Sequence, residues 1–154
     1  MATPSSPAPA PVFNHVALTC RDPLAIERFY TTHFGFSRAR VAPLSDGKQI
    51  VFIRSGGIYL ELFAADDPAP MPEGTADGPH HPGVRHIAFK VEDLDATLGA
   101  LGDEVKRRIT LGPLDFSAFI PGWRTVWLAD PEGNIVEISQ GYVDQDDPPK
   151  LAPL

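Results

Sequence analysis

A ten-residue pattern occurs twice in this chain, and it constrains the fold more than any other feature of the sequence. The first copy covers residues 13–22 and reads FNHVALTCRD, and the second covers residues 84–93 and reads VRHIAFKVED. Both copies have the order x-x-His-apolar-Ala-apolar-x-x-x-Asp, and their composition and alternation predict a β-strand. The chain is therefore expected to consist of two related halves.

A helical pattern follows each of these strands. Asp22 is a candidate N-cap with Pro23 at the first helical position, and the apolar spacing predicts a helix over residues 23–33. Asp93 is the corresponding candidate N-cap for a helix over residues 94–101. Each half thus begins with a strand and a helix.

Three more strands are predicted after each helix. They cover residues 36–41, 49–54 and 58–63 in the first half, and residues 104–109, 125–129 and 135–139 in the second. Gly56-Gly57 predicts a hairpin turn, and residues 130–134 predict another. The 14 residues 110–123 are predicted to form a loop, which is long enough to suggest a lid or a pocket wall.

This order predicts an α+β fold of two βαβββ repeats. One such unit cannot bury its sheet alone, and pairing two units gives a half-open, eight-stranded curved sheet with helices on its outer side. The expected organisation is a disordered arm rich in Pro and Ala over 1–11, a single domain over 12–142 with halves 12–64 and 84–142 and a linker over 65–83, and a tail over 143–154.

Composition excludes several classes of protein. The formal net charge is −7 and no run is rich in Lys or Arg, so we expect no nucleic-acid partner and no anionic-membrane partner. The single cysteine, Cys20, rules out an internal disulfide and is expected in the core. The first residues do not resemble a signal peptide, and no apolar stretch approaches the roughly 20 residues of a membrane helix, so a cytoplasmic location is expected.

Each half carries a histidine and a glutamate at corresponding places. His15 and His86 lie in the first predicted strands, and Glu61 and Glu137 are the only charged residues in the last predicted strands. A carboxylate on a half-buried strand is unfavourable unless it is paired, hydrogen-bonded or bound to metal. Alternatively, each glutamate faces water from the open side of an antiparallel sheet. The matched set of four favours a shared metal site.

Two neutral imidazoles and two carboxylates give a site of zero net charge around one divalent ion. Mixed nitrogen and oxygen ligands suit Ni²⁺, Co²⁺, Zn²⁺, Mn²⁺ or Fe²⁺. Four protein ligands leave two places in an octahedron, where a small-molecule substrate with two neighbouring oxygens could chelate. The ion would then polarise a carbonyl and stabilise an enolate-like intermediate.

Several other residues are candidates for the substrate pocket. Phe116, Phe119 and Trp123 in the predicted loop could form an aromatic wall, or could cap the edge of the core. Arg124 could hold a carboxylate or phosphate, or could be a solvated arginine. Trp127 is expected in the core.

Five segments resemble the vicinal oxygen chelate superfamily of glyoxalases, bleomycin-resistance proteins and dioxygenases. The resemblance covers residues 13 to 142 and rests on segments 15–18, 29–36, 59–62, 84–89 and 128–137. The most specific of them is the Asp-Pro-x-Gly-Asn turn that leads into an apolar strand with Glu137 at its centre. The resemblance implies the glyoxalase-like fold, a homodimer, and metal ligands at His15, Glu61, His86 and Glu137.

The resemblance also implies an activity. A carboxylate at Glu61 favours the branch of metal-dependent lyases, isomerases and epimerases, in which Glu61 or Glu137 would be the catalytic proton shuttle. Glu61 is the preferred base because two aromatic residues, Tyr59 and Phe63, flank it on its strand face and would shield its carboxylate from water. Tyr59 is also a candidate pocket residue. The alternatives are a non-haem Fe(II) dioxygenase of the extradiol type and a metal-free binding or resistance protein. The native metal, any involvement of a thiol such as glutathione, and the origin of the four ligands in one chain or two are left open.

Overall fold

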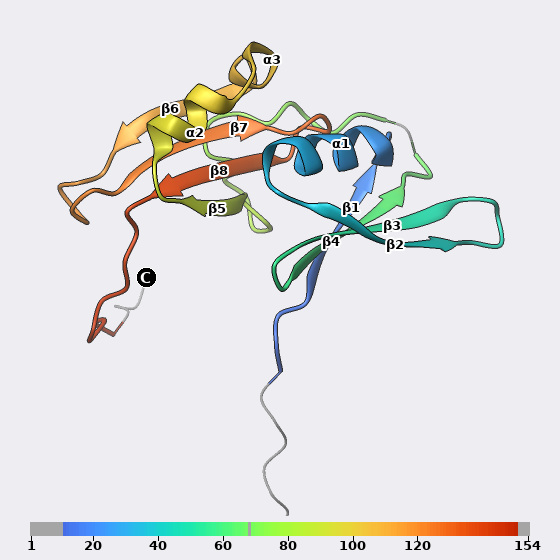
Figure 1. Ribbon diagram of the computed structural model, residues 1–154, viewed down its shortest axis with the longest axis horizontal. Helices are drawn as coiled ribbons and strands as arrows, with labels where there is room; N and C mark the ends of the chain where they lie inside the picture. Colours follow the sequence, from blue (N-terminus) through green and yellow to red (C-terminus); the bar gives the residue numbers. More distant parts are fainter. Residues whose placement is uncertain (1–10, 68, 151–154) are drawn as a thin grey trace, which may run out of the picture. The chain divides into compact units, whose positions relative to one another are not determined.

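The structure is a computed structural model that describes residues 11–67 and 69–150. Its contacts divide the chain into two compact units, one up to residue 68 and one from residue 69 on. Each unit contains a four-stranded mixed sheet with helical structure on one face (Figure 1). The prediction of an α+β fold with two βαβββ repeats is confirmed.

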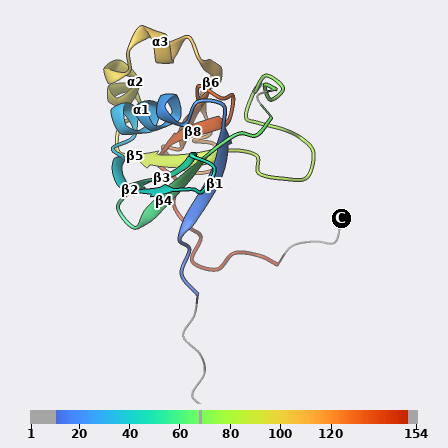
Figure 2. The same ribbon diagram turned by 90° about the vertical axis from the view of Figure 1, so that its right-hand side faces the viewer.

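The first unit follows the predicted order. Its elements are β1 (His15–Cys20), α1 (Pro23–His33), β2 (Ser37–Pro43), β3 (Gln49–Ser55) and β4 (Ile58–Ala64). The sheet has the strand order β1-β4-β3-β2, with β1 parallel to β4 and the other pairs antiparallel. The helix α1 lies along one face of this sheet in both views (Figures 1 and 2).

The ends and the faces of these elements follow from local chemistry. Asp22 caps α1, because its side chain accepts hydrogen bonds from the backbone N–H groups of Leu24 and Ala25. Alternate residues of the central strands are buried beneath the helix, as a strand covered on one face requires. The core of the first unit contains Cys20, Ile26, Phe29, Tyr30, Phe36, Val51, Ile53, Leu60 and Leu62. Among the described residues, no helix of this unit lies over the opposite face of the sheet, which is called the open face below.

The second unit repeats this plan with one addition. Its elements are β5 (Ile87–Val91), α2 (Leu94–Ala100), α3 (Asp103–Lys106), β6 (Ile109–Asp115), β7 (Arg124–Ala129) and β8 (Ile135–Gln140). The strand order β5-β8-β7-β6 has the same form as that of the first unit, with β5 parallel to β8. The side chain of Asp93 caps α2 by accepting from the N–H of Ala96.

The predicted strand over residues 104–109 is wrong in most of its length. Residues Asp103–Lys106 form the short helix α3, and β6 begins only at Ile109. Acidic residues in the first turn of α3 and Lys106 in its last turn suit the helix dipole. The segment has apolar residues only at Val105 and Ile109, four positions apart, so it lacks the alternation of a half-buried strand.

The predicted loop over residues 110–123 is wrong in its first part, because β6 extends to Asp115. Gly112 and Pro113 made this segment look like a loop. However, β6 is the edge strand of its sheet, and proline is tolerated on an edge strand because its missing N–H faces away from the ladder. The register shifts on either side of Leu111 are consistent with an irregular edge. Only residues 116–123 connect β6 to β7.

His86 directly precedes β5 rather than lying within it, a difference of one residue from the predicted strand. The turn at residues 130–134 forms as predicted. Asp130 is buried, and its side chain accepts hydrogen bonds from the backbone N–H groups of Glu132 and Asn134. This turn fixes the register of β8 against β7. None of the helices in the described part of the chain has the length and apolar character needed to cross a membrane.

Candidate metal centre

One histidine and one glutamate meet on the open face of the first sheet. His15 begins β1, and the parallel register pairs Ala17, two residues later, with Glu61 of β4. Side chains two residues apart on a strand share a face, so His15 and Glu61 lie on the same side of the sheet. Nε2 of His15 is 3.3 Å from Oε2 of Glu61.

The second unit contains the equivalent pair. Its register pairs Ala88, two residues after His86, with Glu137 of β8. Nε2 of His86 is 2.8 Å from Oε2 of Glu137. The strand register that relates the histidine to the glutamate is therefore the same in both units, as expected for a binding site that repeats with the fold.

The other ring nitrogen of each histidine is held by an oxygen. Nδ1 of His15 is 2.7 Å from Oδ1 of Asn14, and Nδ1 of His86 is 2.7 Å from the backbone carbonyl oxygen of Asp77. A carbonyl oxygen only accepts hydrogen bonds, so Nδ1 carries the hydrogen and donates. This arrangement fixes the ring and directs Nε2 at the glutamate, as in histidines that bind metal.

A close backbone approach holds the Asp77 carbonyl against His86. Gly78 has a φ of 113°, and a Cβ at this position would lie 2.0 Å from the backbone oxygen of Arg85. Glycine is therefore required for the segment to reach the start of β5. The Asp77 carboxylate also accepts hydrogen bonds from Nε and Nη2 of Arg85, at 2.9 and 3.0 Å. Asp77 and Gly78, which lie in the predicted linker, thus hold the ring of His86 in place.

The charge state of Asp77 follows from these contacts. Burial by itself would raise the pKa of Asp77, but the hydrogen bonds and charge of Arg85, together with a backbone hydrogen bond and the charge of His80, hold that pKa below its usual value. The carboxylate is therefore ionised at neutral pH and keeps the Arg85 pair intact.

Glu137 has a further partner that Glu61 lacks. Trp127 of β7 lies directly opposite Glu137, and its indole Nε1 donates to Oε2 of Glu137 at 3.1 Å. The strand neighbour of Glu61 at the equivalent place is Phe52, which has no donor. Sequence reasoning placed Trp127 simply in the core. It is buried, but its polar edge is used at the site.

The donor chemistry of the two pairs suits a divalent metal ion. Imidazole Nε2 and a carboxylate oxygen are both electron-pair donors, so separations of 2.8 and 3.3 Å need a shared proton or a shared cation. Two ligands at about 2.1 Å from one ion and at right angles to each other would lie about 3 Å apart. Each His–Glu pair therefore fits two adjacent ligand places.

The structure brings the four predicted ligands together as two pairs. In the described part of the chain, no group of three or more His, Cys, Asp or Glu side chains is gathered so that it could hold a metal ion. The predicted four-ligand centre thus remains a hypothesis, and the two pairs are the geometry on which it is based.

The predicted aromatic wall lies near Glu137 only in part. The rings of Phe116 and Trp123 pack in a tilted arrangement with centroids 4.8 Å apart, and the centroids of Phe116 and Trp127 are 6.4 Å apart. Trp123 Nε1 donates to the Ser139 hydroxyl at 3.0 Å, on the same strand face as Glu137. Phe119 is not packed with these aromatic residues to the same extent, because 78% of its surface is exposed.

Arg124 points to the other side of the sheet. It pairs with Gln140 of β8, which lies three residues after Glu137 and therefore projects from the opposite face of the sheet. Its guanidinium donates to both carboxylate oxygens of Asp95 on α2, at 2.7 and 2.9 Å. The arginine therefore ties the helix to the sheet. Tyr59, the remaining predicted pocket residue, lies on the open face of the first sheet, directly opposite His15.

The chain belongs to the Glyoxalase/Bleomycin resistance protein/Dioxygenase superfamily, whose family profile matches residues 12–138. This agrees with the resemblance found in the sequence and with the βαβββ repeats. No match was found among curated proteins.

Solved structures with this fold include a lyase and a binding protein. A glyoxalase family protein from Enterococcus faecalis is 26% identical, with 83% of this chain and 96% of that chain covered and a TM-score of 0.59. Lactoylglutathione lyase from Agrobacterium tumefaciens is 25% identical, with 87% and 96% covered and a TM-score of 0.53. TnmS3, an antibiotic binding protein from a Streptomyces species, is 21% identical, with 86% and 98% covered and a TM-score of 0.58. The last likeness supports the fold alone.

Proposed function

We propose that this protein is a metal-dependent lyase or isomerase of the glyoxalase type, in which two His–Glu pairs complete one four-ligand centre. The observation that carries this proposal is the repeat of one device, a histidine with its Nδ1 hydrogen-bonded and its Nε2 directed at a glutamate, at equivalent registers of both sheets. The two pairs come either from the two halves of one chain or from halves of two chains in a homodimer.

The ligands in this proposal are His15, Glu61, His86 and Glu137. A divalent ion of the Ni²⁺, Co²⁺, Zn²⁺, Mn²⁺ or Fe²⁺ class, when bound, polarises a substrate carbonyl and acidifies the hydrogen on the neighbouring carbon. Two neutral imidazoles and two carboxylates balance its charge. The substrate is a small molecule with two neighbouring oxygens, in line with the lactoylglutathione in the name of the Agrobacterium relative.

The two glutamates have different roles in this proposal. Glu137 accepts from Trp127 and contacts His86, so it is held and acts as a fixed ligand. Glu61 has the longer contact to its histidine and no aromatic donor opposite it. It is therefore the glutamate with freedom to accept a proton from the substrate carbon and return it to the adjacent carbon.

The test compares Glu61→Gln with Glu137→Gln. Glutamine retains one oxygen ligand but cannot accept the proton. Glu61→Gln is expected to keep bound metal and to lose about 10²–10⁴-fold in the rate of solvent deuterium incorporation. Glu137→Gln is expected to lose metal affinity, because the fixed ligand is weakened. Hydroxyacetone and lactoylglutathione serve as exchange substrates, and Glu92→Gln, an exposed glutamate outside the pairs, is the matched control.

The outcomes separate the alternatives. If Glu61→Gln binds metal and exchanges deuterium at the wild-type rate, Glu61 is not the base. Activity that requires iron and consumes O₂ would favour the extradiol-type dioxygenase. A protein that neither retains a transition metal on purification nor binds one on addition would leave the binding-protein function in its place.

A further inference from the structure

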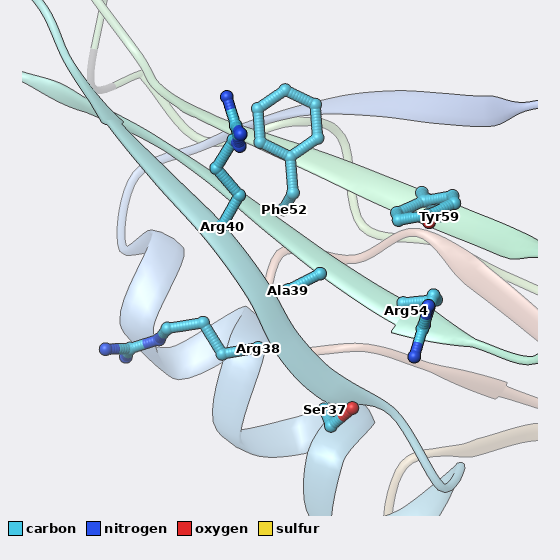
Figure 3. Close-up of a pocket in the computed structure, with 7 residues that line it drawn as sticks. All are labelled: Ser37, Arg38, Ala39, Arg40, Phe52, Arg54 and Tyr59. Atoms are coloured by element: carbon cyan, nitrogen blue, oxygen red, sulfur yellow. The ribbon is translucent and has the colours of Figure 1, made fainter.

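The open face of the first sheet carries a hollow of about 420 Å³ (Figure 3). Besides Arg38 of β2, two more arginines and two aromatic residues line it. They are Arg40 of β2, Phe52 and Arg54 of β3, and Tyr59 of β4. None of these was singled out from the sequence as an anion-binding residue, because they are far apart in the chain and lie on three strands.

Strand register places these four side chains on one face. Arg40 lies directly opposite Phe52, and Arg54 lies directly opposite Tyr59. Directly opposed residues of antiparallel strands project from the same side of a sheet. The two arginines are diagonal neighbours on β2 and β3, with backbones roughly 7–8 Å apart, a separation that long side chains can span.

The charges of these two arginines are not neutralised within the described chain. Neither Arg40 nor Arg54 has a carboxylate at ion-pair distance or a side-chain hydrogen bond among residues 11–67 and 69–150. By contrast, the neighbouring Arg38 turns to α1 and donates to both carboxylate oxygens of Glu27. Figure 3 shows Arg38 directed away from Phe52 and Arg40. Two unpaired guanidinium groups at one hollow favour an anion there.

Strand pairing relates the arginines of the hollow to Glu61 and His15. One row of cross-strand neighbours runs from Arg40 through Phe52 to Glu61. A second row runs from Arg54 through Tyr59 to His15. Neighbouring strands are about 4.8 Å apart, so the backbone of each arginine is about 10 Å from the backbone of the predicted ligand at the other end of its row, two strands away. An aromatic ring lies between them in both rows.

We propose that this hollow binds an anionic group, a carboxylate or a phosphate, at one end of a substrate whose flat apolar part lies over Phe52 and Tyr59. The reacting oxygens then reach Glu61 and His15 at the other end. The position of the reacting end rests on the proposed function, whereas the binding of the anion does not depend on metal. Specificity for an anionic substrate with an aromatic or similarly flat middle follows from this arrangement.

The experiment measures binding of three small probes to the full-length protein by calorimetry or ligand-observed NMR. Phenylacetate and phenyl phosphate each combine a ring with an anion, and 2-phenylacetamide is the neutral counterpart. The anions are expected to bind at least about tenfold more tightly than the amide, since a charge-assisted hydrogen bond contributes about 1.5–3 kcal/mol. Preference for phenyl phosphate or for phenylacetate identifies the anion as phosphate or carboxylate.

Variants locate the binding. Arg40→Gln and Arg54→Gln are each expected to weaken binding of the anionic probes about tenfold and to leave the amide unaffected. Arg28→Gln removes the same charge from the exposed side of α1 and is expected to change nothing. Added salt should weaken the anions and not the amide, which tests the charge effect without any substitution.

The inference is overturned if the amide binds as well as the anions, if neither anion binds, or if Arg28→Gln weakens binding as much as Arg54→Gln. Metal content measured on the same samples separates this result from the proposed function. Arg40→Gln and Arg54→Gln should retain wild-type metal, and His15→Ala should retain the anion binding. Loss of one property without the other therefore identifies which proposal has failed.

Discussion

The two halves of this protein carry the same His–Glu device in unequal surroundings. In the second half, His86 donates to a main-chain carbonyl and Glu137 accepts from Trp127, and their side chains are 23% and 11% exposed. In the first half, His15 donates to the side chain of Asn14, and the side chain of His15 is 41% exposed. The second half therefore holds its pair with more hydrogen bonds and exposes its histidine less, whereas the two glutamates differ little in exposure, with 16% for Glu61 and 11% for Glu137.

This difference suggests a division of labour between repeats. Hydrogen bonds from outside the ligand set fix the orientation of a metal-binding side chain, and a ligand that must also move protons benefits from fewer of them. The second half is then the anchor of the proposed centre, and the first half is the reactive side.

Removing a histidine should have the largest effect. His15→Ala and His86→Ala are each expected to lower metal affinity by more than about 100-fold, because a direct ligand contributes more than its supporting contacts. The loss in His86→Ala should be the greater, since that ring is held by the backbone. Metal content after dialysis against a chelator measures this, with His81→Ala in the exposed linker as control. If both variants keep stoichiometric metal, the four-ligand hypothesis is wrong.

Removing the support of each histidine should have a smaller effect. A Cβ at Gly78 would lie 2.0 Å from the Arg85 carbonyl oxygen, so Gly78→Ala should displace the Asp77 carbonyl from His86. We expect a loss of about 10–100-fold in metal affinity. Asn14→Ala should lose about tenfold, because water can replace an exposed amide oxygen.

The control for that experiment is Gly57→Ala. A Cβ at Gly57 meets no atom within 4 Å, so the substitution should leave metal affinity unchanged. A larger loss in Asn14→Ala than in Gly78→Ala would reverse the assignment of anchor and reactive side.

Trp127→Phe should destabilise the metal-free fold by about 1–3 kcal/mol, because it removes the aromatic donor to a buried carboxylate. Trp123→Phe is the matched control, since it removes the same donor from a neutral hydroxyl, that of Ser139. Its expected loss is about 0.5–1.5 kcal/mol. Urea unfolding at neutral pH measures both. Equal losses would mean that the hydrogen bond from Trp127 to the Glu137 carboxylate stabilises the fold no more than the hydrogen bond from Trp123 to a neutral hydroxyl.

The smallest effect is expected at the ion pair between Asp95 and Arg124. The hydrogen bonds from Arg124 hold the pKa of Asp95 below its usual value of 3.8, against the opposing effect of burial and with a further contribution from the charge of Arg124. Because the pKa is depressed in the folded state, the stabilisation is present above pH 3.8 and is lost as the pH falls below it. Asp95→Asn should lower the thermal midpoint slightly at pH 7, and the difference should shrink as the pH falls below 3.8 and through the depressed pKa of Asp95. A difference that persists in acid would show a packing effect instead.

Much of the fold could be predicted from local chemistry. The Asp22-Pro23 start gave the bounds of α1, and the Asp130 turn led into β8, because capping and turn chemistry are encoded by neighbouring residues. The prediction was wrong where local and tertiary preferences disagree. Pro113 looks like a loop residue, and only the edge position of β6 makes it acceptable in a strand.

The repeat, the α+β class and the histidine and glutamate of each half can be predicted from local sequence, because periodicity and spacing are properties of the chain alone. The surroundings of these residues depend on how the strands pair. Trp127 faces Glu137, Arg54 faces Tyr59, and Arg124 turns to α2, because strand order and register bring distant residues opposite each other. A difference of one residue in register moves a side chain to the other face of the sheet, so local sequence cannot assign these contacts.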